Sequence, residues 1–161
     1  MIVQHNCCRV YATSIAALET GLRLGAALVC LQEPYVDSDF GHGGFAIRWP
    51  EAETRRECRV AVAVQKDLLN TLAFDTQTDL INHPYFLVTD IWELALGPQR
   101  QRQRRTRVVN VYDNIIGEGC TWQGSVARWR RALEDVNWEP VLQGRVLLIG
   151  DFNAYSEMWN P

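Results

Sequence analysis

The chain has 161 residues, a net charge of −3 and 47% hydrophobic residues, which fits one domain with a buried core and excludes an intrinsically disordered protein. No apolar run is long enough to cross a bilayer, and the N-terminus lacks the build of a signal peptide. We therefore expect an intracellular protein without a membrane partner. The five cysteines contain no Cys-x-x-Cys pair, which argues against a disulfide framework and a zinc site.

The first part of the chain predicts a strand, a helix and a second strand. Short apolar runs bounded by polar residues predict strands over 1–4 and 27–32. Between them, apolar residues at helical spacing predict a helix that begins near 13–14 and stops at Gly25. Two strands joined by a helix favour a parallel pair with a right-handed crossover.

The middle of the chain predicts antiparallel strands. Candidate strands lie at 45–48, 59–64, 86–94 and 107–111, and polar turns separate them. Cys30, in the earlier strand 27–32, is interpreted as a small buried hydrophobic residue.

Five arginines lie close together at 100–107, the last of them at the start of the predicted strand 107–111, with no acidic residue between Gly97 and Tyr112. Their position between two predicted strands indicates a hairpin loop. One interpretation is contact with the DNA backbone, for which Arg105 is the candidate substrate-binding residue. The alternative, which we favour, is a solvated loop, because runs of charge are commonly exposed.

The last part of the chain repeats the opening pattern. Apolar residues at helical spacing predict a helix over 125–136, with Ser125 as its cap, and a strand follows at 146–149. The whole chain, 1–161, therefore reads as a single domain of α/β (α+β) class, with mixed sheets and helices on the outside.

Polar side chains follow four of the predicted strands, at the point where each strand ends. Ligands of α/β sheets bind outside the carboxyl ends of the strands, so these side chains are expected to converge in one pocket. The candidate site residues are Asn6, Glu33, Tyr112, Asn114, Asp151 and Asn153.

The chemistry of these groups indicates a metal-assisted reaction on a phosphate ester. Carboxylate and amide oxygens are hard ligands, which suit Mg²⁺ or Mn²⁺ better than zinc. A magnesium ion bridges to phosphate oxygens, and amides or a phenol can hold a non-bridging oxygen. The pattern therefore favours hydrolysis of a phosphodiester or a phosphomonoester.

Four segments, in order, resemble the successive motifs of the endonuclease/exonuclease/phosphatase superfamily: Gln4-His5-Asn6, Gln32-Glu33-Pro34, Asn110-Val111-Tyr112-Asp113-Asn114 and Gly150-Asp151-Phe152-Asn153-Ala154. The segment at 41–47 and Trp159 resemble its non-LTR retrotransposon branch, whose endonucleases accompany a reverse transcriptase. The resemblance covers essentially the whole chain. It implies a four-layer α/β sandwich of two packed sheets flanked by helices.

The resemblance also implies a role for each site residue. Glu33 would bind the catalytic Mg²⁺ or Mn²⁺, with Asp151 beside it and Asn6 supporting the ion or its waters. Asp151 would also orient or activate the attacking water. Tyr112 and Asn153 would contact the scissile phosphate, with Asn114 nearby. The substrate would be double-stranded DNA in the nucleus, and no obligate protein partner is identifiable.

Two departures from the superfamily pattern shape the expected activity. A later Ser/Asp/His segment has no counterpart in the 161 residues, and Tyr155 stands where the retrotransposon branch has a histidine. We therefore expect a truncated domain, with the second half of the sandwich incomplete and weak or no nuclease activity. The alternatives are a phosphatase that acts on a small phosphorylated substrate and a non-catalytic remnant or interaction module.

Overall fold

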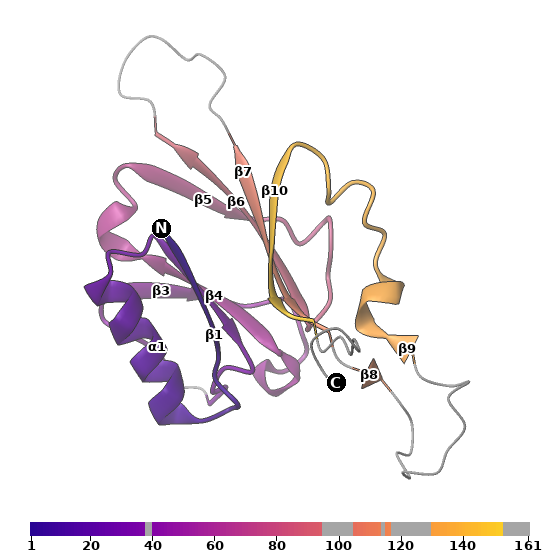
Figure 1. Ribbon diagram of the computed structural model, residues 1–161, viewed down its shortest axis with the longest axis horizontal. Coiled ribbons are helices and arrows are strands. Elements are labelled where there is room, and N and C mark those ends of the chain that lie inside the picture. Colours follow the sequence, from indigo (N-terminus) through magenta and orange to yellow (C-terminus); the bar gives the residue numbers. More distant parts are fainter. Residues whose placement is uncertain (38–39, 95–104, 114, 117–129, 153–161) are drawn as a thin grey trace, which may run out of the picture.

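Two four-stranded sheets pack face to face, with one α-helix on the outer face of the first (Figure 1). The computed structural model describes residues 1–37, 40–94, 105–113, 115–116 and 130–152. Both sheets mix parallel and antiparallel strands, which confirms the predicted fold class. No helix in these ranges is long and apolar enough to span a membrane.

The first sheet has the strand order β1-β2-β4-β3. Its strands are β1 (Ile2–Asn6), β2 (Leu28–Gln32), β3 (Phe45–Arg48) and β4 (Val60–Gln65). β1 and β2 are parallel and are connected through helix α1 (Tyr11–Arg23), as the sequence predicts. β4 pairs antiparallel with β2 and with β3.

Helix α1 begins two residues before the predicted start and stops where it was predicted to stop. Ser14 lies inside the first turn, where its Oγ donates to the Val10 carbonyl oxygen at 3.0 Å, so it does not cap the helix. Gly25 adopts the left-handed conformation, with φ of 65°, and its N–H donates to the Leu22 carbonyl oxygen. This is the usual way in which glycine ends a helix.

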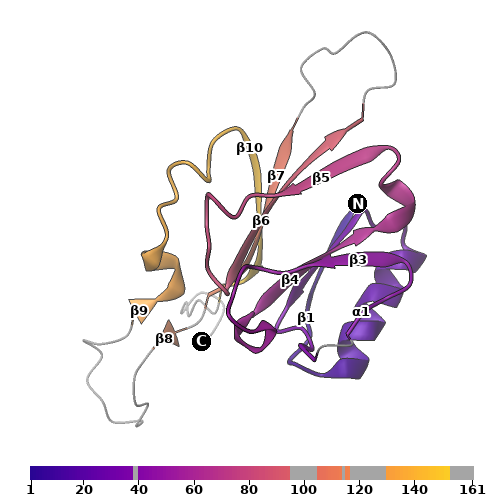
Figure 2. The same ribbon diagram turned by 180° about the vertical axis from the view of Figure 1, so that it is seen from behind.

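The second sheet has the strand order β10-β7-β6-β5 (Figure 2). Its strands are β5 (Leu72–Thr76), β6 (Phe86–Glu93), β7 (Thr106–Tyr112) and β10 (Arg145–Asp151). β10 is parallel to β7, and the other pairs are antiparallel. β5 is not predicted from the sequence, because its residues are only partly buried and its apolar pattern is weak.

The predicted helix over 125–136 is wrong in the part that the structure describes. There the chain forms a short strand and then a 3-10 turn. Two hydrogen bonds explain the turn: the Leu133 N–H donates to Asp113 Oδ1 at 3.2 Å, and the Leu133 carbonyl accepts from Trp138 Nε1 at 2.8 Å. The remaining short elements are β8 (Ile115–Ile116), β9 (Arg130–Arg131), η1 (Arg55–Glu57), η2 (Lys66–Leu68) and η4 (Ala132–Asp135).

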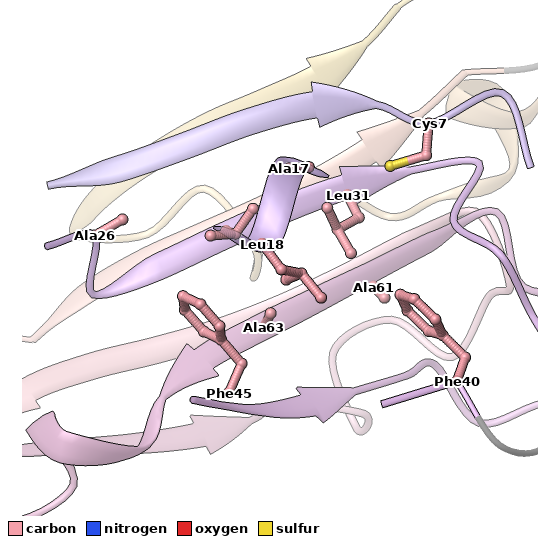
Figure 3. Close-up of a cluster of buried hydrophobic side chains, with 10 residues drawn as sticks. Cys7, Ala17, Leu18, Ala26, Leu31, Phe40, Phe45, Ala61 and Ala63 are labelled. Atoms are coloured by element: carbon pink, nitrogen blue, oxygen red, sulfur yellow. The ribbon is translucent and has the colours of Figure 1, made fainter. Parts of the chain in front are cut away.

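The described residues form three hydrophobic layers, one on each face of the first sheet and one on the outer face of the second. On β2, Leu28 and Cys30 face the second sheet, whereas Val29 and Leu31 pack with α1 (Figure 3). All five β2 residues are buried because both faces of the sheet are covered, which explains why this strand reads as a continuous apolar run. The interpretation of Cys30 as a buried hydrophobic residue is confirmed.

The outer face of the second sheet is covered differently. Leu133, Val136 and Trp138, which belong to the segment before β10, pack there in place of an α-helix. The sequence predicts an incomplete second half, yet both sheets have four strands in the described ranges. The contrast with the first sheet lies at the edge strand β10, where Leu147 and Leu148 are 41% and 37% exposed.

Candidate functional site

The carboxyl ends of four strands from the two sheets meet at one place. The parallel register of β1 and β2 sets Asn6 opposite Gln32, the residue before Glu33. The parallel register of β7 and β10 sets Asp151 opposite Tyr112. β1, β7 and β10 run in the same direction, and β1 contacts β10 (Figure 1). The predicted convergence of the strand ends is therefore found in the structure.

Asn6 connects the two sheets at this place. Its Nδ2 donates a hydrogen bond of 2.7 Å to Asp151 Oδ2, between residues 145 positions apart in the chain. Its Oδ1 accepts from the backbone N–H of Cys8 at 3.0 Å. Both ends of the amide are therefore engaged, and the Asp151 carboxylate is held against the end of β1.

Glu33 is held in an unusual backbone conformation. Its φ is 44°, in the left-handed region that residues with a side chain rarely adopt. Two hydrogen bonds of 2.7 Å fix this peptide: the Glu33 N–H donates to the Arg59 carbonyl, and the Glu33 carbonyl accepts from the Arg9 N–H. The carboxylate forms a long ion pair, 3.6 Å from Arg59 Nη1 to Glu33 Oε1.

The Tyr112 phenol lies close enough to Glu33 and Asp151 for the charges of both carboxylates to raise its pKa. Burial raises its pKa above the ordinary value, and the charge of Glu33, a side-chain hydrogen bond with Glu33 and the charge of Asp151 raise it further. The hydroxyl therefore stays protonated at neutral pH, and its hydrogen bond is made with Glu33. The same interactions place Glu33, Tyr112 and Asp151 in one cluster, which we call the acidic cluster together with Asn6.

Sequence reasoning missed two arginines beside the acidic cluster. Arg9 follows β1, and its charge interacts with Glu33, Tyr112 and Arg59. Burial lowers the pKa of Arg9 most, and the nearby charge of Arg59 lowers it next. The only available sequence signal was position, since Arg9 lies three residues after the Asn6 motif and Arg59 directly precedes β4.

A buried polar bridge joins the two sheets one residue below the acidic cluster. Gln32 Nε2 donates to Asn110 Oδ1, and Gln32 Oε1 accepts from Gln4 Nε2 at 2.7 Å. Asn110 Nδ2 donates to the carbonyls of Leu31 and Ala61 at 3.0 and 2.9 Å. Gln32 and Asn110 are fully buried. This bridge, which the sequence did not predict, fixes how the sheets meet below the site.

The residue before Asp151, Gly150, has to be glycine for a steric reason. Its φ is 151°, and a Cβ at this position would lie 1.9 Å from the carbonyl oxygen of Val111 on the neighbouring strand. Only glycine therefore permits this close approach of β10 to β7. The approach brings Asp151 level with Tyr112, so the glycine of the Gly-Asp-Phe-Asn segment positions the acid.

Arg105 is not brought to the acidic cluster. It precedes β7, at the opposite end of the strand from Tyr112, where its guanidinium lies 3.3 Å from Asp90 and over the Trp92 ring. Arg107 is not solvated, since its side chain is 13% exposed and its Nε donates to Asp90 Oδ1 at 2.9 Å. Arg100, Arg102 and Arg104 lie outside the described residues, as do the predicted site residues Asn114 and Asn153.

The oxygen atoms of the acidic cluster fit a hard divalent ion. Within the described ranges, no group of three or more His, Cys, Asp or Glu side chains that could hold a metal ion occurs. Two carboxylates, Glu33 and Asp151, lie near the Tyr112 phenol at the ends of strands from both sheets. Magnesium is commonly held by one or two carboxylates, with waters and substrate phosphates completing its shell, so this donor set suits it.

No protein-family model matches the sequence, and no curated protein matches it. Among solved structures, the chain is similar to the endonuclease domain of TRAS1, a telomere-specific non-LTR retrotransposon, with 20% sequence identity and a TM-score of 0.64. The similarity covers 98% of this chain and 61% of that chain, so the present chain spans less than two thirds of its neighbour. At this identity the likeness establishes the fold. The chain has the fold of a non-LTR retrotransposon endonuclease domain, as its motifs predicted.

Proposed function

We propose that the protein is a phosphodiester hydrolase of the DNA endonuclease type that depends on Mg²⁺ or Mn²⁺. The observation that carries the proposal is the hydrogen bond between Asn6 and Asp151, which joins the strand ends of the two sheets. It brings Asp151 into one cluster with Glu33 and Tyr112, and carboxylates at the carboxyl ends of strands are where such sheets bind ligands.

Glu33 and Asp151 would hold the divalent ion, with Asn6 positioning Asp151. When bound, the ion would neutralise charge on the phosphate. The Tyr112 hydroxyl would donate a hydrogen bond to a non-bridging phosphate oxygen, because its raised pKa keeps it protonated. Asp151 would accept a proton from the attacking water. Asn114 and Asn153 are proposed to contact the phosphate from the segments after β7 and β10.

The choice of DNA as substrate rests on the structural neighbour and on the motifs. The TRAS1 domain is described as an endonuclease domain of a retrotransposon. We extend that class to the present chain, with double-stranded DNA as substrate and the nucleus as its place of action. We expect slow turnover, because Tyr155 stands where the retrotransposon branch has a histidine.

A plasmid-nicking assay with Mg²⁺ and with EDTA tests the proposal. We expect slow nicking that requires the metal and falls about 100-fold or more in Glu33→Gln and in Asp151→Asn, a typical contribution of acid–base groups. Glu53→Gln, at an exposed position, serves as the matched control and should nick like the parent. Nicking that persists in both site variants contradicts the proposal.

Two further measurements separate the alternative functions. Titration with Mn²⁺, followed by electron paramagnetic resonance, should show one site that weakens in Glu33→Gln. Binding of Mn²⁺ without any nicking would favour the non-catalytic remnant. Release of phosphate from a small aromatic phosphate ester, together with an intact plasmid, would favour the phosphatase.

A further inference from the structure

Arg9 and Arg59 are placed on either side of Glu33 by the backbone itself. The Arg9 N–H donates to the Glu33 carbonyl, and the Arg59 carbonyl accepts from the Glu33 N–H, both at 2.7 Å. Arg59 is held further by a 2.8 Å bond from its N–H to the Pro84 carbonyl. Arg9 is also in the left-handed conformation, with φ of 57°. The local structure is therefore constrained to present both guanidinium groups at the acidic cluster.

The guanidinium groups have few partners for their donors. The Nε atoms of Arg9 and Arg59 are both buried and have no hydrogen-bond partner among the residues that the structure describes. Arg9 Nη2 donates to the backbone carbonyl of Arg56 at 3.0 Å, and Arg59 reaches Glu33 only at 3.6 Å. A buried donor without a partner is costly, so these groups are suited to an acceptor that arrives with a ligand.

Of the two arginines, Glu33 forms an ion pair only with Arg59, so its charge does not by itself explain why both arginines lie beside it. Its carboxylate forms one long ion pair, with Arg59, while Asp151 is engaged by Asn6. Arg59 also lies close enough to Arg9 for its charge to lower the pKa of Arg9. Arg9 and Arg59 balance the charges of Glu33 and Asp151, so a divalent ion bound by the two carboxylates would leave the cluster with an excess of positive charge. The combination favours an anionic ligand.

We propose that Arg9 and Arg59 form a clamp for a phosphate group of the nucleic-acid substrate, next to Glu33. The guanidinium plane presents parallel N–H donors whose spacing matches two oxygens of a phosphate, so two such groups fix its position as well as its charge. The clamp rests on the proposed function for the identity of the ligand. It assigns substrate binding to two residues outside the superfamily motifs, one from each side of the left-handed Glu33.

DNA affinity without metal tests the clamp separately from catalysis. In this experiment the full chain is titrated into a fluorescent duplex in EDTA, and anisotropy gives the dissociation constant at several salt concentrations. We expect Arg9→Gln and Arg59→Gln each to weaken binding about 10-fold, as for a lost charge-assisted hydrogen bond. Each should also reduce the salt slope by roughly one phosphate contact. Arg23→Gln, in the exposed last turn of α1, should change neither.

Lysine variants keep the test decisive if a glutamine variant unfolds. Arg9→Lys and Arg59→Lys retain the charge and remove the planar donors, so they should keep most of the salt slope and still lose affinity about threefold or more. Circular dichroism checks the fold of every variant. Unchanged affinity and slope in folded variants at both positions would overturn the clamp.

The two proposals can fail independently. If nicking depends on Glu33 while the arginine variants bind DNA like the parent, the clamp is wrong and the proposed function stands. If the arginine variants lose DNA affinity while Glu33→Gln leaves nicking unchanged, the proposed catalytic site is wrong and the clamp stands. Inorganic phosphate, titrated against the amide spectrum of the protein, should shift the signals of Arg9 and Arg59 in the parent.

Discussion

The two sheets contribute equally to the acidic cluster but are built differently. Glu33 follows β2, a strand that is buried along its whole length between α1 and the second sheet. Asp151 ends β10, an edge strand whose Leu147 and Leu148 are substantially exposed. One carboxylate is therefore supplied by the most deeply packed part of the molecule, and the other by one of its least covered strands.

This difference means that the site depends on how the sheets meet. Asn6 and Asp151 join the two sheets at the surface, and Gln32 and Asn110 join them in the interior. A change that loosens the second sheet should therefore displace Asp151, while leaving Glu33 in place. The variants below probe the second sheet, the contact between the sheets and the first sheet, in order of decreasing expected effect.

The largest loss of stability is expected from Asp90→Ala in the second sheet. Asp90 is fully buried and accepts two hydrogen bonds from Arg107, at 2.9 and 3.1 Å. Its removal leaves the nearly buried guanidinium of Arg107 without its counter-ion, which typically costs about 3–5 kcal/mol. Urea denaturation measures the loss.

Arg105→Ala is the matched control for Asp90→Ala. Its side chain is 55% exposed, so the ion pair with Asp90 should contribute no more than about 1 kcal/mol. A loss in Arg105→Ala as large as that in Asp90→Ala would show that the second sheet does not depend on the buried pair.

Asn110→Ala should weaken the contact between the sheets by about 3 kcal/mol. The substitution leaves the buried Gln32 amide without its acceptor, which is expensive, and removes a second donor from the carbonyls of Leu31 and Ala61, which also pair with each other between β2 and β4. Gln4→Ala, which removes only the outer member of the bridge, should cost less than half as much. Equal losses, measured by urea denaturation, would mean that the bridge does not hold the sheets together.

Gly21→Ala should destabilise the first sheet by about 1–2 kcal/mol. A Cβ at Gly21 would lie 2.3 Å from Val29 Cγ2, so α1 has to move away from β2. Overpacking costs roughly 1–3 kcal/mol, and the better helix propensity of alanine offsets part of it. Gly43→Ala, where a Cβ meets nothing within 4 Å, should change the melting temperature little. Increased stability of Gly21→Ala would show that α1 is loosely packed.

The smallest change in stability is expected from Cys8→Ser, within about 0.5 kcal/mol, because Cys8 is exposed. Among the described cysteines, Cys8 should be the one that a thiol reagent labels quickly, and mass spectrometry identifies it. Burial raises the pKa of Cys30 from 9.0 to about 12, so its thiol stays neutral and protected. Rapid labelling of Cys30 would show that the first sheet opens easily.

The same shift gives a pH dependence with a definite sign. Because folding favours the neutral Cys30 thiol, its contribution to stability is complete below pH 9.0 and is lost as the pH rises toward about 12. A Cys30→Ala variant should therefore lose less stability than the parent over this range. An equal loss in both proteins would assign the decline to other groups.

The sequence predicted the strands of the core because their physical signal is local. Phe45–Arg48 was predicted with its observed bounds, and β2 and β4 were predicted to within one residue, since strands with both faces buried read as apolar runs. The strand ends also marked where the acidic cluster would form. The helix over 125–136 failed because helical spacing competed with the hydrogen bonds that Leu133 makes to Asp113, 20 positions away, and to Trp138, five positions away.

The parts of the site that could not be predicted depend on contacts between segments far apart in the chain. Arg9 and Arg59 reach Glu33 through backbone hydrogen bonds that have no local sequence signature. Arg107 was predicted to begin a strand, but its side chain was counted with the solvated arginines; the register of β6 and β7 sets it opposite Asp90, which draws it inward. The buried bridge through Asn110 likewise requires both sheets to be in place.

The left-handed backbone at Glu33 makes this position informative about evolutionary history. A residue with a side chain loses roughly 1–2 kcal/mol in that conformation, whereas glycine does not. In a lineage freed from any need for the carboxylate, mutation would therefore tend to replace glutamate here with glycine or asparagine and gain stability. Related sequences that retain an acidic residue at position 33 would indicate continuing selection for the carboxylate. Related sequences with glycine there would indicate that this selection has ended.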